Sequence, residues 1–276
     1  MTIAHRIVFF SPAGTTRKVA EAIGDFLRAR GQSVALLDLA RGQNPAACFG
    51  SDSKSTCLWL GSPVYCDHAV PLVEDFVRSM PRSGGFAVPF VTWGAVTSGL
   101  ALPEMAACLA ERGFAVLGAA KVMAEHSSLW QSLQPLAGGR PDPGDLRRIE
   151  ELVEEVLTKI ARGGTEVLPA ERLDYLPPAL KAQSSAKSLA GIKAMQPPIA
   201  AKEELCTRCG HCAQICPVTA IRLDPFPVID DSCILCRQCT RHCPVGAYPY
   251  DGAAVEIRIQ GMAKQSVEAK ETEVFV

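Results

Sequence analysis

The sequence has no long apolar run, little excess charge of either sign and few aromatic residues. No stretch of 18 or more residues is continuously apolar, so no membrane-spanning helix is expected. Lys and Arg number 28 against 29 Asp and Glu, and a general nucleic-acid binder needs a more cationic surface. The first residues, MTIAHRIVFF, lack the apolar core and cleavage site of a signal peptide. These absences predict a cytoplasmic protein with no membrane span and no nucleic-acid partner.

Cysteine is abundant: the 276 residues include 12. A disulfide scaffold this rich in cysteine is usually shorter and secreted, whereas clustered thiols in a reducing compartment more often bind metal. Eight of the cysteines lie within 38 residues, between positions 206 and 243. The other four are spread over the first 200 residues and are expected to be small buried side chains. They are Cys48, Cys57, Cys66 and Cys108.

An internal repeat contains the eight clustered cysteines. CTRCGHCAQICPVTAI (206–221) and CILCRQCTRHCPVGAY (233–248) agree at 7 of 16 positions with an offset of 27. Each reads C-x2-C-x2-C-x3-C-P, the bacterial run for [4Fe–4S] clusters, in which the fourth cysteine ligates the other cluster. Zinc sites also use C-x2-C pairs, but two four-cysteine runs ending in Pro fit zinc poorly. The predicted ligands are Cys206, Cys209, Cys212 and Cys243 for cluster I, and Cys233, Cys236, Cys239 and Cys216 for cluster II.

The first 163 residues alternate short apolar runs with helical patterns. This alternation of strands and helices predicts an α/β fold with a doubly wound parallel sheet of five strands and helices on both faces. Such sheets bind ligands at the carboxyl ends of their strands. Strands are expected at 6–10, 33–39, 57–63, 86–93 and 114–122, and helices at 15–30, 71–79, 103–112 and 144–161.

The loop SPAGTTRK (11–18) follows the first predicted strand and opens the first predicted helix. It offers hydroxyl groups, a glycine that permits close backbone approach, and the free N–H groups of a helix N-terminus, which together suit a phosphate. It contains neither Gly-x-Gly-x-x-Gly nor Gly-Lys-Ser/Thr, so a dinucleotide fold and a P-loop are not indicated.

This loop resembles the flavodoxin loop that holds the FMN phosphate, with Ala13 where many flavodoxins have Thr or Ser. GSPVYCDHAVP (61–71) and TWGAVTSG (92–99) resemble the two flavodoxin loops beside the isoalloxazine ring. The resemblance implies that Tyr65 and Trp93 pack on the ring, although both also fit ordinary core packing. The FMN-binding residues it implies are Ser11, Ala13, Gly14, Thr15, Thr16, Ser62, Pro63, Val64, Tyr65, Thr92, Trp93, Gly94 and Gly99.

The whole chain is similar in order and length to the flavodoxin–ferredoxin fusion family. That resemblance implies a flavodoxin-like domain at residues 1–163, a linker at 164–200 with a short helix near 179–190, and a small α+β bacterial ferredoxin domain at 201–250. Residues 251–276 are expected to be a tail that is either frayed or ordered against another subunit. The second alternative would make the protein a dimer or larger oligomer.

The function expected from this layout is electron transfer between two [4Fe–4S] clusters and FMN, to or from a redox protein partner. One alternative is a ferredoxin-dependent FMN reductase of a small organic acceptor such as a quinone or enone. His126 or Tyr65 would then line the pocket, and His126 is otherwise a loop histidine that caps local structure. Another alternative is a cluster-based redox sensor or interaction protein.

The sequence does not decide the roles of three further side chains in the predicted flavin loop at 61–71. Cys66 is either a redox thiol beside the flavin or a small buried residue. Asp67 and His68 form a possible acid and base pair in the same loop.

Overall fold

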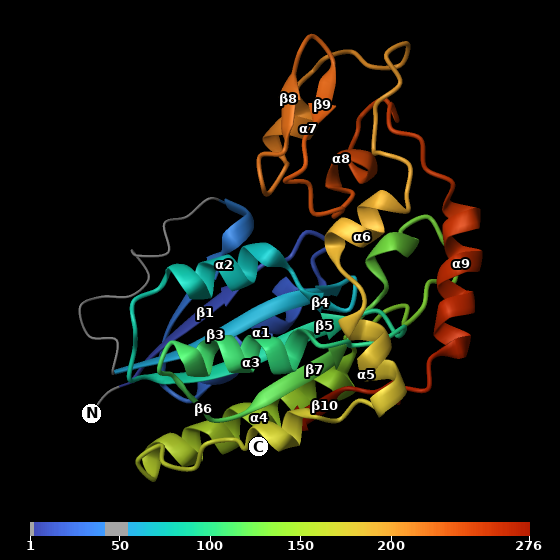
Figure 1. Ribbon diagram of the computed structural model, residues 1–276. Coiled ribbons are helices and arrows are strands. Elements are labelled where there is room, and N and C mark those ends of the chain that lie inside the picture. The colour runs from blue at the N-terminus through green and yellow to red at the C-terminus, as the bar shows by residue number, and fades with distance from the viewer. Residues whose placement is uncertain (1–2, 42–54) are drawn as a thin grey trace.

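The computed structural model describes residues 3–41 and 55–276, so the expectation for Cys48 lies outside the described residues. The chain forms an α/β domain and, above it in Figure 1, a small cysteine-rich module. The segment that connects them runs up the side of the α/β domain through helix α6 (Leu189–Ala194).

The predicted five parallel strands are present and their order is β2-β1-β3-β5-β7. This is the flavodoxin-like doubly wound order, 2-1-3-4-5 when only these strands are counted, and it confirms the predicted fold class. Two two-residue strands, β4 (His68–Ala69) and β6 (Ala115–Val116), pair with β3 and β5. The main strands are β1 (Ala4–Phe9), β2 (Ser33–Asp38), β3 (Thr56–Tyr65), β5 (Phe86–Trp93) and β7 (Ala119–Met123).

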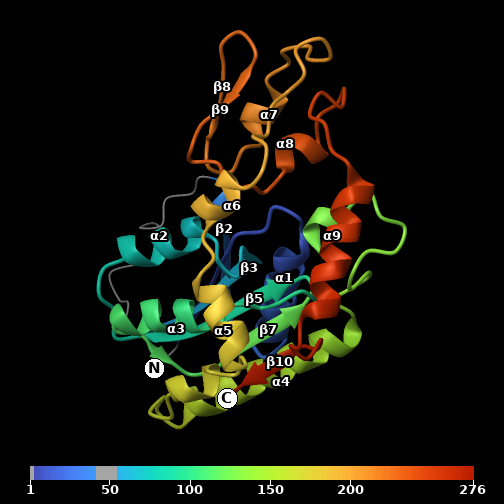
Figure 2. The same cartoon turned by 45° about the vertical axis from the view of Figure 1, so that its right-hand side comes forward.

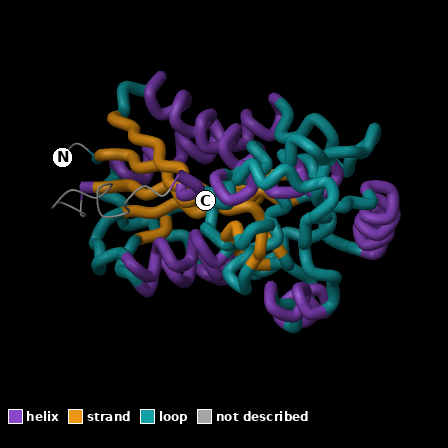
Figure 3. The backbone as a smooth tube through the Cα atoms, turned by 90° about the horizontal axis from the view of Figure 1, so that it is seen from above, coloured by secondary structure: helices purple, strands orange, loops and turns teal. Residues whose placement is uncertain are grey.

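Helices cover both faces of the sheet, as the view from above in Figure 3 shows. Side chains alternate between the faces of a strand, so Ile7 and Phe9 of β1 join one core while Val8 joins the other. The first core includes α1 (Thr15–Ala29) and α4 (Pro143–Ala161). The second includes α2 (Pro71–Ser79) and α3 (Ala101–Glu111).

The C-terminal tail is ordered against its own chain. It contains α9 (Gly252–Gln265) and a sixth sheet strand, β10 (Glu273–Phe275), which pairs antiparallel with the edge strand β7. Phe275 is buried and stacks on Tyr175 with 5.2 Å between ring centroids. Figure 2 shows α9 standing beside the α/β domain before the chain returns to the sheet. The sheet therefore gains an antiparallel edge strand that the sequence did not predict.

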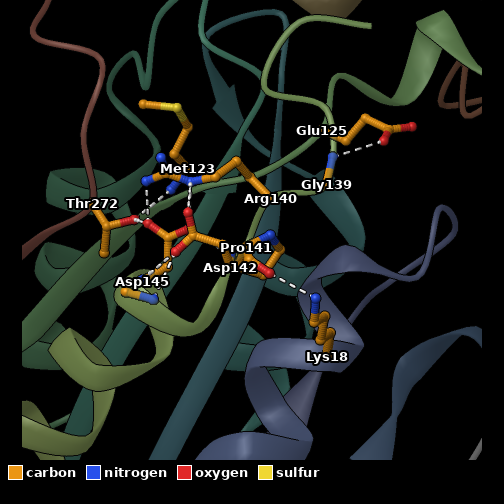
Figure 4. Close-up of polar contacts among 10 residues, drawn as sticks. Lys18, Met123, Glu125, Gly139, Arg140, Pro141, Asp142, Asp145 and Thr272 are labelled. Atoms are coloured by element: carbon orange, nitrogen blue, oxygen red, sulfur yellow. Dashed lines mark hydrogen bonds and ion pairs between the residues drawn. The ribbon is translucent and has the colours of Figure 1, made fainter. Parts of the chain in front are cut away.

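A cluster of polar contacts fastens the tail near the start of α4 (Figure 4). The hydroxyl of Thr272 donates to Asp145, and it accepts a hydrogen bond of 3.0 Å from the backbone N–H of Met123. Asp145 also pairs with Arg140 and accepts from the backbone N–H of Asp142 in a capping box. Lys18 reaches the same region, where its ammonium donates to the carbonyl of Pro141 at 2.6 Å.

The segment between the two domains is also packed. It contains two short helices, α5 (Pro178–Ser185) and α6, preceded by the 3-10 turn η5 (Ala170–Leu173). Leu173 and Leu180 are buried, and the ammonium of Lys187 lies 2.6 Å from Oδ2 of Asp67. The segment therefore has a fixed path along the α/β domain.

The cysteine-rich module repeats its backbone with the sequence offset of 27. Its helices α7 (His211–Gln214) and α8 (Gln238–Arg241) correspond, and β8 (Ile221–Leu223) pairs with β9 (Pro227–Ile229). Gly210 before α7 and Arg237 before α8 both have left-handed backbones. Within residues 3–41 and 55–276, no helix is both long and apolar enough to cross a membrane.

Candidate redox site

The structure brings together the four cysteines assigned to cluster I. They line one small hollow, where Cys243 of the second run lies beside the three cysteines of the first run. The loop reaches this position because Pro244 follows Cys243 and the chain turns back. The hollow is lined by Cys206, Cys209, Cys212 and Cys243 together with Pro227, Ala247 and Tyr248, among others.

The cysteines assigned to cluster II are also neighbours. Burial raises the pKa of the Cys236 thiol to about 12, and the charges of Cys239, Cys216 and Cys233 add to the effect. Burial and two of the same neighbours raise the pKa of Cys239 to about 11. Thiolates crowded in this way need a compensating positive charge, which the iron of a cluster supplies. Cys236 and its neighbours are the set assigned to cluster II, and the crossed assignment of ligands stays a prediction.

The backbone around the sulfur atoms is symmetric between the two halves. The N–H of Ala220 donates to Sγ of Cys216 at 3.2 Å, and the N–H of Ala247 donates to Sγ of Cys243 at 3.3 Å. Both pairs are four residues apart and the two bonds are related by the repeat offset. Hydrogen bonds to cluster sulfurs are one means by which proteins adjust cluster potentials.

A cavity of about 240 Å³ lies at the carboxyl ends of the strands. All three loops predicted to bind FMN contribute to it, as expected for a doubly wound sheet. Four of the predicted residues lie outside its lining: Ser11, Gly14, Ser62 and Gly99. The predicted residues that line it are Ala13, Thr15, Thr16, Pro63, Val64, Tyr65, Thr92, Trp93 and Gly94.

The residues outside the lining shape the loops. Oγ of Ser11 accepts from the N–H of Arg17 at 2.9 Å, and Oγ of Ser62 accepts from the N–H of Val70 at 3.0 Å. Gly99 has a φ of 57°, and a Cβ there would overlap the carbonyl oxygen of Asp67. The glycine therefore permits two flavin loops to approach each other.

The first loop keeps features that suit a phosphate. Gly14 precedes α1 with a φ of 93° and has no side chain to cap the helix, so the N–H groups of Thr15 and Thr16 receive no cap from it, whereas that of Arg17 donates to Ser11. Within the described chain, a Cβ on Gly14 would meet no atom within 4 Å, so space lies beside the loop. The hydroxyls of Thr16 and Thr92 are 2.7 Å apart and join this loop to the third one.

The two basic residues of this loop are engaged elsewhere. Arg17 forms an ion pair with Asp38, and Lys18 donates to Pro141. The positive end of α1 is therefore the main source of positive potential that this loop offers to a phosphate.

Tyr65 and Trp93, the two aromatic residues predicted to pack on the flavin ring, both line the cavity. Trp93 is 1% exposed, and its indole N–H has no hydrogen-bond partner among the described residues. A buried donor without a partner is costly, and an acceptor atom of a bound flavin would satisfy it. Burial raises the pKa of Tyr65, and the nearby thiol of Cys236 raises it further. Tyr65 is therefore close to a predicted cluster ligand.

The second cluster loop forms part of the same cavity. Ile234, Leu235, Cys236 and Arg237 all line it. Ile234 is 4% exposed and belongs to the hydrophobic core that includes α2 and α3. The side-chain amide of Gln238 donates to the carbonyl of Pro12 in the first loop.

The corresponding first cluster loop faces solvent. Thr207 occupies the position of Ile234 in the first half of the repeat and is exposed, as is Cys209, the counterpart of Cys236. The two halves therefore have different neighbours although their backbones match.

His126 lines the cavity at the end of β7. Burial lowers its pKa to about 4, and the charge of Arg258 lowers it further, so the ring is neutral at pH 7. Its Nδ1 accepts from the N–H of Ser128 at 3.2 Å, which caps the turn η4 (Ser127–Leu129). In this neutral ring the proton is on Nε2, which leaves a hydrogen-bond donor beside the cavity.

Asp67 and His68 hold the linker. Oδ2 of Asp67 accepts from the hydroxyl of Ser184 at 3.0 Å and from Lys187. Nδ1 of His68 lies 2.9 Å from Glu104, and its Nε2 lies within 3.1 Å of two linker carbonyls. These contacts fix the path of α5 and α6 past the cavity.

The remaining cysteines differ in position. Cys66 lines the cavity with a φ of 54°, and burial followed by the charge of Asp67 raises its pKa. Cys57 is fully buried in β3, and burial raises its pKa. Both are therefore protonated thiols at neutral pH, and Cys66 is the one beside the cavity.

Several cavity residues have no signal in the sequence. The linker contributes Lys187, Ile192 and Gln196, and α9 contributes Val255, Arg258, Ile259 and Met262. No motif marks these positions, because tertiary packing alone brings them to the flavin loops.

Comparison with known families identifies the C-terminal module. Residues 205–247 match the model of the 4Fe-4S dicluster domain. The module is therefore a domain for two [4Fe–4S] clusters, as the repeated cysteine runs predicted. With the strand order of the sheet, this match confirms the predicted layout of a flavodoxin-like domain followed by a ferredoxin-type domain. None of the curated proteins matches the sequence significantly.

Several solved structures align with part of this chain. A flavodoxin from the domain Archaea is 20% identical (TM-score 0.43; 57% of this chain, 99% of that one), and Flavodoxin 1 from Bacillus cereus is 19% identical (TM-score 0.44; 56% and 97%). Rubredoxin oxygen:oxidoreductase from the anaerobe Desulfovibrio gigas is 16% identical (TM-score 0.46), with 59% of this chain matched to 37% of that one. At these identities and scores, the fold is assigned from the strand order itself.

Proposed function

We propose that this chain is an electron-transfer iron–sulfur flavoprotein that relays electrons between its two [4Fe–4S] clusters and FMN. One observation carries the proposal. Cys236, a ligand assigned to cluster II, lines the same cavity as Tyr65 and Trp93 of the flavin loops. Cluster II, bound by Cys236, and a flavin in the cavity would then be separated only by the side chains that line the cavity.

The residues proposed to hold FMN follow from the geometry of the cavity. The N-terminus of α1 with Thr15 and Thr16 receives the phosphate. Tyr65 and Trp93 flank the ring, and the unpartnered indole N–H of Trp93 donates to one of its acceptors. When bound, the clusters supply one-electron chemistry and FMN supplies one- or two-electron chemistry.

The protein orients the two kinds of cofactor and excludes water between them. Ile234 packs into the core of the α/β domain, and Gln238 bonds to the first flavin loop. The linker and α9 complete the walls of the cavity. The docked module therefore needs no large movement to bring cluster II to the flavin.

Cluster I is the proposed contact with a redox protein partner. Cys209 is exposed, and the apolar side chains of Leu205, Leu223 and Val245 are between 42% and 47% exposed in the same module. An apolar surface around an accessible cluster suits brief docking of another electron carrier.

Anaerobic analysis of the purified protein tests the proposal. We expect close to eight irons and eight sulfides per chain, as two [4Fe–4S] clusters require, and one FMN. Iron well below eight after reconstitution, or failure to bind FMN, would contradict it.

A second function, reduction of a small organic acceptor, is favoured by the position of His126 in the cavity lining and by its Nε2–H. In this function His126 donates a hydrogen bond to an acceptor such as a quinone or enone. Turnover with a reduced ferredoxin-like donor that falls in His126→Asn but not in the exposed tail variant Glu271→Gln supports it. Equal turnover in both variants, or none in the wild type, argues for the carrier.

A further inference from the structure

The C-terminal tail reaches the proposed flavin site at two places. Its helix α9 contributes the side chains of Val255, Arg258, Ile259 and Met262 to the cavity wall. Three residues beyond this helix, Glu268 enters the interior next to the third flavin loop, residues 92–99. Figure 2 shows the tail passing from α9 to β10 across this end of the sheet.

Glu268 is a buried carboxylate that binds this loop through three hydrogen bonds. Its side chain is 3% exposed. Oε2 accepts from the backbone N–H of Ser98 at 2.8 Å and from the hydroxyl of Thr97 at 2.9 Å. The hydroxyl of Ser98 donates to Oε1. Thr97 itself lines the cavity, so the carboxylate holds a residue of the flavin site directly.

The loop needs such support because its backbone is unusual. Ala95 has a φ of 59° and Gly99 has a φ of 57°, both in the left-handed region. A non-glycine residue there costs about 1 kcal/mol or more and persists when surrounding contacts fix it. Thr97 and Ser98, which donate the three hydrogen bonds to Glu268, lie between these two positions.

A buried lysine balances the charge of Glu268. The ammonium of Lys121 lies 3.1 Å from Oε1 of Glu268 and 3.2 Å from Glu273, and the lysine side chain is 3% exposed. It also lies 5.6 Å from the ring centroid of Trp93, which lines the cavity. Buried charges are tolerated when they are paired and hydrogen-bonded, as both are here.

We propose that Glu268 is a positioning residue for the flavin: it fixes the loop at residues 92–99 in its binding shape and, with Lys121, sets the charge beside the ring. This inference rests on the proposed binding of FMN in the cavity. Thr272 and β10 hold the tail through contacts that do not involve Glu268, so we expect the tail to stay in place when Glu268 is changed.

FMN affinity of the full-length protein tests the first effect. Glu268→Ala leaves three donors of the loop without their acceptor, and we expect FMN to bind at least about tenfold more weakly. Glu268→Gln keeps the size of the side chain and retains part of the affinity. Glu271→Gln, an exposed change in the same tail, serves as the matched control and leaves affinity unchanged. Iron content should be the same in all four proteins.

The flavin midpoint potential tests the second effect with a readout that loop packing alone would not move. Glu268→Gln removes a negative charge and raises the potential, whereas Lys121→Met removes a positive charge and lowers it. An FMN dissociation constant of Glu268→Ala within twofold of the wild type, or potential shifts of the same sign in Glu268→Gln and Lys121→Met, overturns the inference. Failure of the wild type to bind FMN instead refutes the proposed function.

Discussion

Ile234 offers a way to weaken the docking of the cluster module without touching a cluster ligand. The side chain is 4% exposed and packs into the core of the α/β domain. Ile234→Ala removes three buried carbons, worth about 0.8 kcal/mol each, and the cavity left behind raises the cost to about 3 kcal/mol. If this free energy is lost only from the docking of the cluster module on the α/β domain, the equilibrium constant for docking falls by about a hundredfold.

The assay is the rate of flavin reduction after the clusters have been reduced in an anaerobic stopped-flow experiment. Thr207→Ala is the matched control, because Thr207 has the same place in the first half of the repeat and is exposed. We expect the rate to fall in Ile234→Ala and to stay at the wild-type value in Thr207→Ala, with iron and FMN content equal in both. Equal rates in the two variants would refute the idea that docking at Ile234 brings cluster II to the flavin.

Three other predictions concern the cluster, a flavin loop and pH. Cys236→Ala should remove cluster II, so that iron per chain falls by about half while FMN stays bound and is no longer reduced through the clusters. Retention of the full iron content would show that Cys236 is not a ligand. Gly99→Ala places a Cβ against the carbonyl of Asp67 at a left-handed position, and we expect it to lower the free energy of unfolding by more than about 2 kcal/mol. Gly139→Ala, also left-handed but with space around it, should cost about 1 kcal/mol in the same chemical denaturation. Burial lowers the pKa of His5 to about 4, so the unfolded chain takes up its proton near pH 6.5 while the folded protein stays neutral there. Stability should therefore fall between pH 6.5 and 4, by about 1.4 kcal/mol per unit for this residue, and His5→Leu should flatten that part of the curve. The same pH dependence in wild type and variant would contradict this assignment.

The sequence predicted those features that depend on local pattern. The five parallel strands follow from short apolar runs that repeat with regular spacing, and the domain for two clusters follows from cysteines whose spacing is set by the size of one cubane. The three loops predicted to bind FMN were expected to lie together because each follows a strand, and the carboxyl ends of parallel strands meet at one edge; they do line one cavity.

The remaining features depend on contacts between distant residues. The strand Glu273–Phe275 has three residues and pairs with Ala119–Lys121, about 150 positions earlier in the chain, so no local pattern marks it. Ile234 and Thr207 occupy equal places in the repeat, and only the docked structure shows which of them is buried. In the sequence, Glu268 is one of several acidic residues in a polar tail. Its proposed role depends on its buried contacts with the loop at residues 92–99 and with Lys121.

The most direct test of the account is the dependence of flavin reduction on protein concentration in a single anaerobic turnover. The clusters are reduced first, and the flavin absorbance is then followed at several protein concentrations. Because Cys236 and the flavin loops share one cavity, we predict a first-order rate that does not change with concentration. A rate proportional to protein concentration, or clusters that stay reduced beside an oxidised flavin, would contradict an electron path within the chain.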